Sequence, residues 1–76
     1  MTEKTSGPHT LDQVTSATII RWGDDRLGVD YRFRGGDREA HALGLDDRLI
    51  LDRLRRAGQL AYVDDDVRRR YAATLK

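Results

Sequence analysis

Apolar and charged side chains alternate between residues 27 and 34. The odd positions are apolar and hold Leu27, Val29, Tyr31 and Phe33, whereas the even positions hold glycine, aspartate and arginine. A period of two is typical of a β-strand with one face toward the core and the other toward solvent. We therefore predict a strand over these residues.

Turn signals on both sides extend this strand into a sheet. Residues 18–22 are β-branched and aromatic, which favours a preceding strand. Residues 23–26 form a Gly-Asp-Asp-Arg turn cluster, and the glycine pair at 35–36 suits a two-residue hairpin loop that leads into a third strand. These patterns predict a three-stranded antiparallel β-meander over residues 15–43.

The first predicted turn, over four residues, decides which side chains of the first strand enter the core. It places Ile20 opposite Val29, so that Ile20 and Trp22 share the apolar face. Ile19 then points to the charged face, as does Leu43 at the end of the meander. We therefore expect both side chains to be exposed and open to a partner.

The second predicted turn gives the outward face of the sheet a set of matched charges. With residues 35–36 as the loop, Arg32 lies opposite Glu39, and Asp30 lies opposite His41. Cross-strand pairs of this kind each stabilise a ladder by roughly 0.2–1 kcal/mol. The sequence therefore predicts an outward sheet face of mixed charge.

A helix is predicted after the meander. Asp46 is a suitable N-cap, and Leu45 and Ile50 flank it with the spacing of a hydrophobic staple. An apolar stripe at helical spacing follows and ends at Gly58, which suits a helix C-terminus. The stripe consists of Ile50, Leu51, Leu54 and Ala57.

The C-terminal residues fit two interpretations. Residues 59–63 favour a short strand, and the apolar positions within 67–75 are spaced for either a strand or one face of a helix. Three aspartates at 64–66 precede three arginines at 68–70 by four residues, which favours the helix.

These elements define the predicted fold class. It is an α+β fold, a three-stranded antiparallel β-meander followed by one or two α-helices packed on one face. A chain of 76 residues is long enough for one domain. We assign residues 14–76 to this domain, and residues 1–13, which are polar and contain Gly7-Pro8, to a flexible N-terminal arm.

A segment of the C-terminal half consists of Leu51-Asp52-Arg53-Leu54-Arg55-Arg56-Ala57-Gly58 followed by Leu60, Tyr62, an acidic turn and Arg70-Tyr71. This segment resembles the recognition helix and wing of winged-helix regulators. The resemblance covers residues 51–71 and implies DNA binding by the C-terminal half. In that family, helices precede the recognition helix, whereas this chain has predicted strands there.

Composition and charge narrow the function classes. The chain is 36% charged but has a net charge of only +1, so it has no general attraction to nucleic acid, and any such site must be local. It contains no cysteine, which excludes disulfides and a thiolate zinc site and agrees with a reducing compartment such as the cytoplasm. No apolar run approaches the roughly 20 residues that a membrane span needs, so we expect no membrane partner.

Candidate catalytic residues are few. His41 pairs with Asp30 in the predicted register, as in half of a catalytic triad, but neither Ser6 nor Ser16 is placed beside it as a nucleophile. The aspartate clusters lack the spacing of a calcium loop, and the glycines lack that of a phosphate loop. We therefore predict that the protein is not an enzyme and has no cofactor, metal site or small-molecule substrate.

The remaining hypothesis is a small non-catalytic binding module. We expect a protein partner or a homodimer, with the protein acting as an adaptor or inhibitor of the kind that phages and mobile elements carry. The alternative is a DNA- or RNA-binding module that uses arginines of the exposed sheet face or the winged-helix-like C-terminal half. The residues predicted to be exposed and to bind are Ile19, Arg21, Arg32, Arg34, Arg55 and Arg56.

Overall fold

The computed structural model describes residues 13–75 of the chain. In chain order the elements are β1 (Val14–Trp22), β2 (Arg26–Phe33), β3 (Arg38–Ala42), α1 (Asp47–Arg56), β4 (Leu60–Tyr62) and α2 (Asp65–Thr74). The predicted flexible arm at residues 1–13 lies outside the described residues, apart from Gln13.

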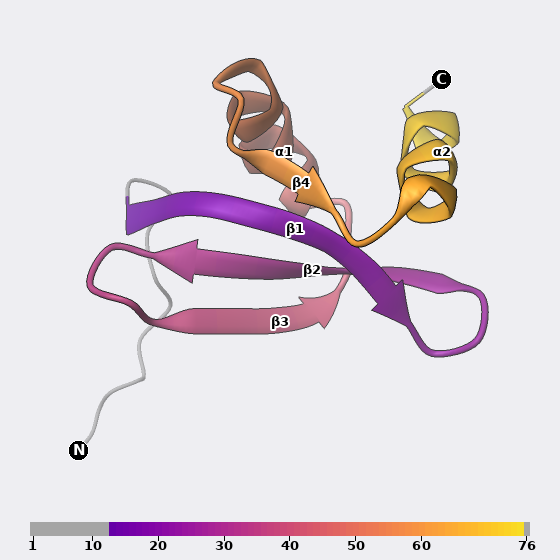
Figure 1. Cartoon of the computed structure of the whole chain (residues 1–76), viewed down its shortest axis with the longest axis horizontal. Coiled ribbons are helices and arrows are strands. Elements are labelled where there is room, and N and C mark those ends of the chain that lie inside the picture. The colour runs from indigo at the N-terminus through magenta and orange to yellow at the C-terminus, as the bar shows by residue number, and fades with distance from the viewer. Residues whose placement is uncertain (1–12, 76) are drawn as a thin grey trace.

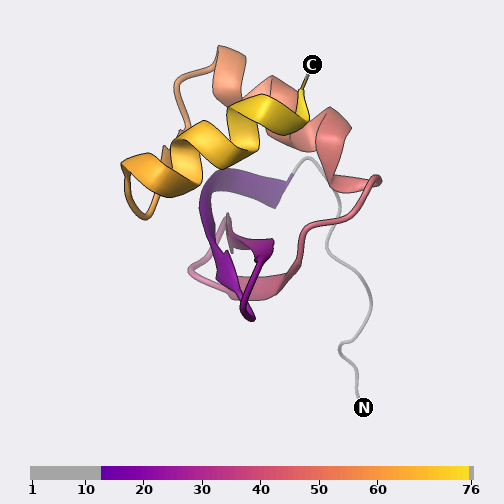
Figure 2. The same ribbon diagram turned by 90° about the vertical axis from the view of Figure 1, so that its right-hand side faces the viewer.

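The four strands form one sheet in the order β3-β2-β1-β4. β1, β2 and β3 are the predicted antiparallel meander, and β4 adds a fourth strand, parallel to β1. Both helices lie on the same face of the sheet, and no described helix covers the other face, which we call the open face (Figure 1, Figure 2). The α+β class, the meander and the packing of the helices on one face are therefore confirmed.

The C-terminal segment contains both of the elements that its sequence allowed. β4 is a strand of three residues, and α2 follows with Asp64 as its N-cap. The Asp64 side chain accepts a hydrogen bond from the backbone N–H of Val67 at 2.9 Å. Val67 and Tyr71 of α2 are buried, whereas Leu75 is exposed, so the helix packs through the predicted stripe as far as Tyr71.

The core lies between the sheet and the two helices. Full burial of an aliphatic or aromatic side chain contributes about 1.5–3 kcal/mol relative to exposure, so this layer holds the domain together. The buried side chains are Ala17, Ile19, Val29, Tyr31, Phe33, Ile50, Leu51, Leu54, Val67 and Tyr71.

The predicted register of β1 against β2 is wrong by one residue. Ile19 lies opposite Val29, and Ile20 lies opposite Gly28, because the connecting loop has three residues, 23–25, instead of four. A shift of one residue moves every side chain of a strand to the other face of the sheet. Ile19 is therefore 0% exposed, and the expectation that it is available to a partner is wrong, whereas Trp22 lies outside the core and is 36% exposed.

The predicted register of β2 against β3 is wrong for the same reason. The loop comprises residues 34–36, and it is closed by a hydrogen bond from the Phe33 N–H to the Asp37 carbonyl at 2.8 Å. Asp30 consequently lies opposite Ala40 and forms an ion pair with Arg38, not with His41. His41 lies opposite Val29, on the side of the sheet that faces the helices.

Leu43 was expected on the charged face, and this expectation is also wrong. Its side chain is half-buried and packs against the core. Its backbone N–H donates to the Leu27 carbonyl at 2.9 Å, which continues the β2–β3 ladder by one step.

The described residues do not form a winged-helix arrangement. Three strands, instead of helices, precede α1. After β4 the chain forms α2, where a winged-helix protein would have the hairpin of the wing. The resemblance of residues 51–71 to that family is therefore limited to the sequence pattern around α1.

The end of α1 at Gly58 yields a prediction of stability. Gly58 has φ +74°, its N–H donates to the Arg55 carbonyl, and the next N–H, of Gln59, donates to the Leu54 carbonyl. This is a Schellman motif, which needs a left-handed residue at Gly58. We expect Gly58→Ala to lower the free energy of unfolding by about 1 kcal/mol in urea denaturation, because alanine is strained at positive φ.

The matched control for this change is Gly44→Ala. Gly44 does not have positive φ, and a Cβ there would meet Asp47 Oδ2 at 3.6 Å, an ordinary contact. We expect its effect to stay within about 0.5 kcal/mol. Equal losses for the two variants would contradict the role given to Gly58.

Candidate functional site

The residues predicted to bind do not form one site. Arg21, near the end of β1, pairs with Asp64 and with Asp66, the latter at 3.4 Å, across to the start of α2. Arg55 and Arg56 both pair with Asp52 of the same helix, at 2.7 and 3.1 Å. Aspartate contacts thus occupy three of the predicted arginines.

Arg32 and Arg34 are different. Both are exposed, and neither forms an ion pair within residues 13–75. Arg32 lies on β2 opposite Arg38, on the open face, and Arg34 lies in the β2–β3 loop. They remain available for an anion, but on a surface separate from the other predicted residues.

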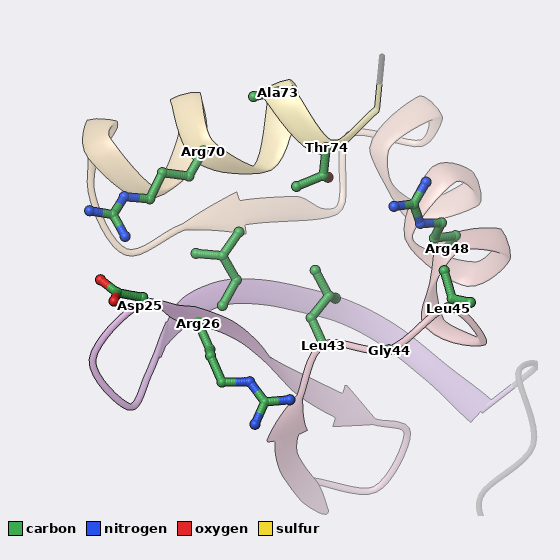
Figure 3. Close-up of a pocket in the computed structure, with 10 residues that line it drawn as sticks. Asp25, Arg26, Leu43, Gly44, Leu45, Arg48, Arg70, Ala73 and Thr74 are labelled. Carbon is green, nitrogen blue, oxygen red and sulfur yellow. The ribbon is translucent and has the colours of Figure 1, made fainter.

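A groove opens at a place that the sequence patterns did not indicate. It lies between the β1–β2 turn, the connection from β3 to α1 and the second half of α2, and its volume is about 710 Å³ (Figure 3). We call it the arginine-framed groove and define it by its lining residues, Asp25, Arg26, Leu27, Leu43, Gly44, Leu45, Arg48, Arg70, Ala73 and Thr74.

Apolar side chains form part of the groove and continue beyond it. Leu27 and Leu43 line it and pack against the core. Leu45 lines it with 80% of its surface exposed, and Leu49, four residues further on, is also 80% exposed. Two large apolar side chains so close in sequence and so exposed are typical of a contact surface.

α1 begins at the predicted N-cap, Asp46, but without the expected local contacts. The Asp46 side chain makes no capping hydrogen bond, and Asp47 instead accepts a hydrogen bond from the Gly44 N–H at 2.8 Å. The expected staple between Leu45 and Ile50 is therefore wrong. Ile50 is buried, whereas Leu45 points away from the core.

The groove has an excess of positive charge, with three arginines and one aspartate among its lining residues. Arg70 projects toward Asp25 at one end, and Arg48 stands beside Leu45 at the other (Figure 3). Arg70 also pairs with Asp66 at 3.1 Å. Arg48 forms no ion pair among residues 13–75, so its guanidinium group is free to bind an anion at the groove. Arg26 lies opposite Trp22, and its side chain leads away from the groove toward the open face (Figure 3).

A polar cluster around Asp47 holds this side of the groove in place. Asp47 Oδ1 accepts a hydrogen bond from the Tyr31 hydroxyl at 2.7 Å and lies 3.0 Å from His41 Nε2. Together with the Gly44 N–H, these contacts fix the first turn of α1, and so Leu45 and Arg48, against β2 and β3.

In this cluster the pKa values of Asp47 and Tyr31 are shifted in opposite directions. Partial burial acts to raise the pKa of Asp47, but the hydrogen bonds from Tyr31, Gly44 and His41 outweigh it and hold that pKa below its ordinary value. Burial, reinforced by the hydrogen bond to Asp47, raises the pKa of Tyr31 far above its ordinary range. Tyr31 is therefore a neutral donor and Asp47 an anionic acceptor.

This chemistry positions α1. His41 contacts two carboxylates, Asp47 and, at 3.2 Å, Glu39, and neither is a nucleophile that a base could activate. Within residues 13–75, no group of three histidine, aspartate or glutamate side chains is arranged to hold a metal ion.

Sequence reasoning missed the groove, although one signal for part of it was present. Leu45 precedes the predicted helix and Leu49 lies in its first turn, and neither belongs to the apolar stripe that begins at Ile50. Two leucines outside the core stripe were a sign of a second apolar surface.

Comparison with known proteins adds no relative, since no family model, curated protein or solved structure matches the chain. None of the helices in the described part of the chain is long and apolar enough to span a membrane. The function is therefore argued from the groove and its surroundings.

Proposed function

We propose that the protein is a non-catalytic protein-binding module whose site is the arginine-framed groove. The observation that carries the proposal is the combination, in one surface, of Leu45, 80% exposed, with the neighbouring Arg48, which forms no ion pair within residues 13–75. The module acts as an adaptor or an inhibitor, in a reducing compartment such as the cytoplasm, as the cysteine-free sequence predicts.

The chemistry of the groove defines the segment that it binds. Leu45 and Leu49 lose contact with water only against apolar side chains, which favours a partner with leucine-like residues. Guanidinium groups bind carboxylates in a bidentate manner, which favours aspartate or glutamate in the same segment. The partner is therefore an acidic, amphipathic segment of another protein.

Nucleic acid is the competing ligand, because arginine binds phosphate as readily as carboxylate. Arg32 and Arg34 support that alternative, since both are exposed and neither forms an ion pair within the described residues. The leucines favour a protein partner at the groove, because a phosphate backbone offers nothing apolar to cover Leu45 or its exposed neighbour Leu49.

Selection of peptides from a random displayed library on the immobilised protein tests the proposal. We expect enrichment of peptides that combine acidic and leucine-like residues. The variant Arg48→Glu should weaken their binding at least about tenfold, or about 1.4 kcal/mol. The double variant Leu45→Ser, Leu49→Ser should also weaken it, with little change in stability because both side chains are exposed.

The matched control is Arg32→Glu, which makes the same charge change outside the groove. We expect it to bind the selected peptides as the natural protein does. Peptides that still bind the groove variant but no longer bind this control variant would overturn the proposal. Tight binding of generic DNA or RNA that weakens steeply with salt, and is lost in the control variant, would favour the nucleic-acid alternative instead.

A further inference from the structure

The strand β3 leaves a row of backbone groups without partners in the described part of the protein. β3 is at the border of the sheet, since the order is β3-β2-β1-β4 (Figure 1). The hydrogen bonds at Asp37 and Leu43 show that odd-numbered residues of this segment bond toward β2. In an antiparallel ladder the intervening residues, Arg38, Ala40 and Ala42, direct their N–H and C=O groups outward.

This border is regular enough to accept another strand. The β2–β3 ladder has no bulge over its five paired positions, and β3 contains no proline. The outward-bonding residues include Ala40 and Ala42, whose small side chains do not obstruct an approaching backbone. Exposed edges of this kind are the usual sites of strand addition.

We propose that β3 pairs antiparallel with β3 of a second copy of this chain, about a two-fold axis at Ala40. This register places Ala40 opposite Ala40, Arg38 opposite Ala42, and Glu39 opposite His41 of the second copy. It uses only outward-directed backbone groups for its hydrogen bonds. The proposal rests on β3 and is independent of what occupies the arginine-framed groove.

Side-chain charge selects this register over its neighbours. Glu39 and His41 form a non-hydrogen-bonded pair across the interface, the kind in which side chains approach most closely. They are already compatible within one chain, where Glu39 Oε2 lies 3.2 Å from His41 Nδ1. A register centred on residue 39 would put Glu39 against Glu39, and one centred on residue 41 would put His41 against His41. Two carboxylates directly opposite each other destabilise a ladder, and two imidazoles give no carboxylate partner to either ring, so the pairing at Ala40 is favoured.

Analytical ultracentrifugation of the full chain, over a micromolar to millimolar concentration series, tests the proposal. We expect a reversible monomer–dimer equilibrium. Ala40→Lys places two ammonium groups opposite each other on the two-fold axis and should raise the dissociation constant at least about tenfold. Ala40→Pro should abolish the dimer, because it removes an outward N–H while the β2–β3 ladder stays intact.

The matched control is Ala61→Lys. Ala61 lies in β4, the strand at the other border of the sheet, where it is exposed and pairs with Thr18 of β1. We expect this variant to dimerise as the natural protein does, and circular dichroism should show all variants folded. A natural protein that stays monomeric over the whole series, or equal effects of lysine at residues 40 and 61, would overturn the proposal.

Discussion

Replacing Ile19 by alanine is expected to lower the free energy of unfolding by about 2–5 kcal/mol, the range for deletion of a buried aliphatic side chain. Ile19 is 0% exposed and lies opposite Val29, at the centre of the layer between sheet and helices. The neighbouring change Ile20→Ala should cost less than about 1 kcal/mol, because Ile20 faces Gly28 on the open side of the sheet.

Urea denaturation followed by circular dichroism measures both changes. A domain of this size is marginally stable, so Ile19→Ala is expected to be largely unfolded without a stabilising osmolyte. Ile19→Val, which should cost about 0.5–1.5 kcal/mol, keeps the comparison quantitative if that happens. A larger loss of stability from Ile20→Ala than from Ile19→Ala would contradict the observed register and support the four-residue turn instead.

Removal of the Asp47 carboxylate is the second change with a large expected effect. Asp47→Ala leaves the part-buried Tyr31 hydroxyl without its acceptor, and the cost of such a group is about 1–3 kcal/mol. It also frees the first turn of α1 from Gly44 and His41. Because that turn carries Arg48 and follows closely after Leu45, we expect weaker peptide binding together with the loss of stability.

The same carboxylate predicts a pH dependence with a definite sign. The folded-state pKa of Asp47 lies below its ordinary value, so its contribution to stability is present above that ordinary value, about pH 3.9, and is lost as pH falls through the folded-state pKa. The pKa of Asp64 is shifted in the same direction, chiefly by the Val67 N–H and by Arg21. Both groups therefore favour the folded state at neutral pH.

Unfolding free energies measured from neutral to acid pH, for the natural protein and its variants, isolate the contribution of Asp47 to the pH dependence of stability. We expect Asp47→Asn to flatten the acid decline relative to the natural protein, since the amide retains the shape and does not titrate. The variant Asp64→Ser retains an N-cap acceptor and serves as the comparison at the other carboxylate. Identical acid declines for the natural protein and Asp47→Asn would contradict the contacts assigned to Asp47.

The patterns that predicted the fold correctly are those decided within one segment. The alternation from Leu27 to Phe33 predicted β2, the stripe from Ile50 to Leu54 predicted α1, and the aspartates before Val67 predicted the start of α2. Each depends on local periodicity and capping, which a single sequence contains.

The registers failed because they depend on loop length. Both hairpins have a three-residue loop, whereas the sequence patterns predicted a loop of four residues in the first hairpin and of two in the second. Each error of one residue exchanged the two faces of a strand. In β1, the adjacent Ile19 and Ile20 offered an apolar side chain to either face, so composition could not correct the mistake.

The groove could not be predicted from the sequence for a related reason. Its lining comes from the β1–β2 turn, the start of β2, the β3–α1 connection, α1 and α2, so no single segment carries its pattern. Arg48, like Arg32 and Arg34, forms no ion pair within residues 13–75, and which arginines stay unpaired depends on where the aspartates lie in space.

An NMR titration of the isotope-labelled protein with a leucine- and glutamate-rich helical peptide tests whether the arginine-framed groove binds an acidic, amphipathic segment. We expect amide shifts to change at Leu27, Leu43, Gly44, Leu45 and Ala73 around the groove, and Arg48→Glu to remove the changes. Shifts confined to the open face around Trp22 and Arg32, or no shifts at all while single-stranded nucleic acid perturbs that face, would contradict it.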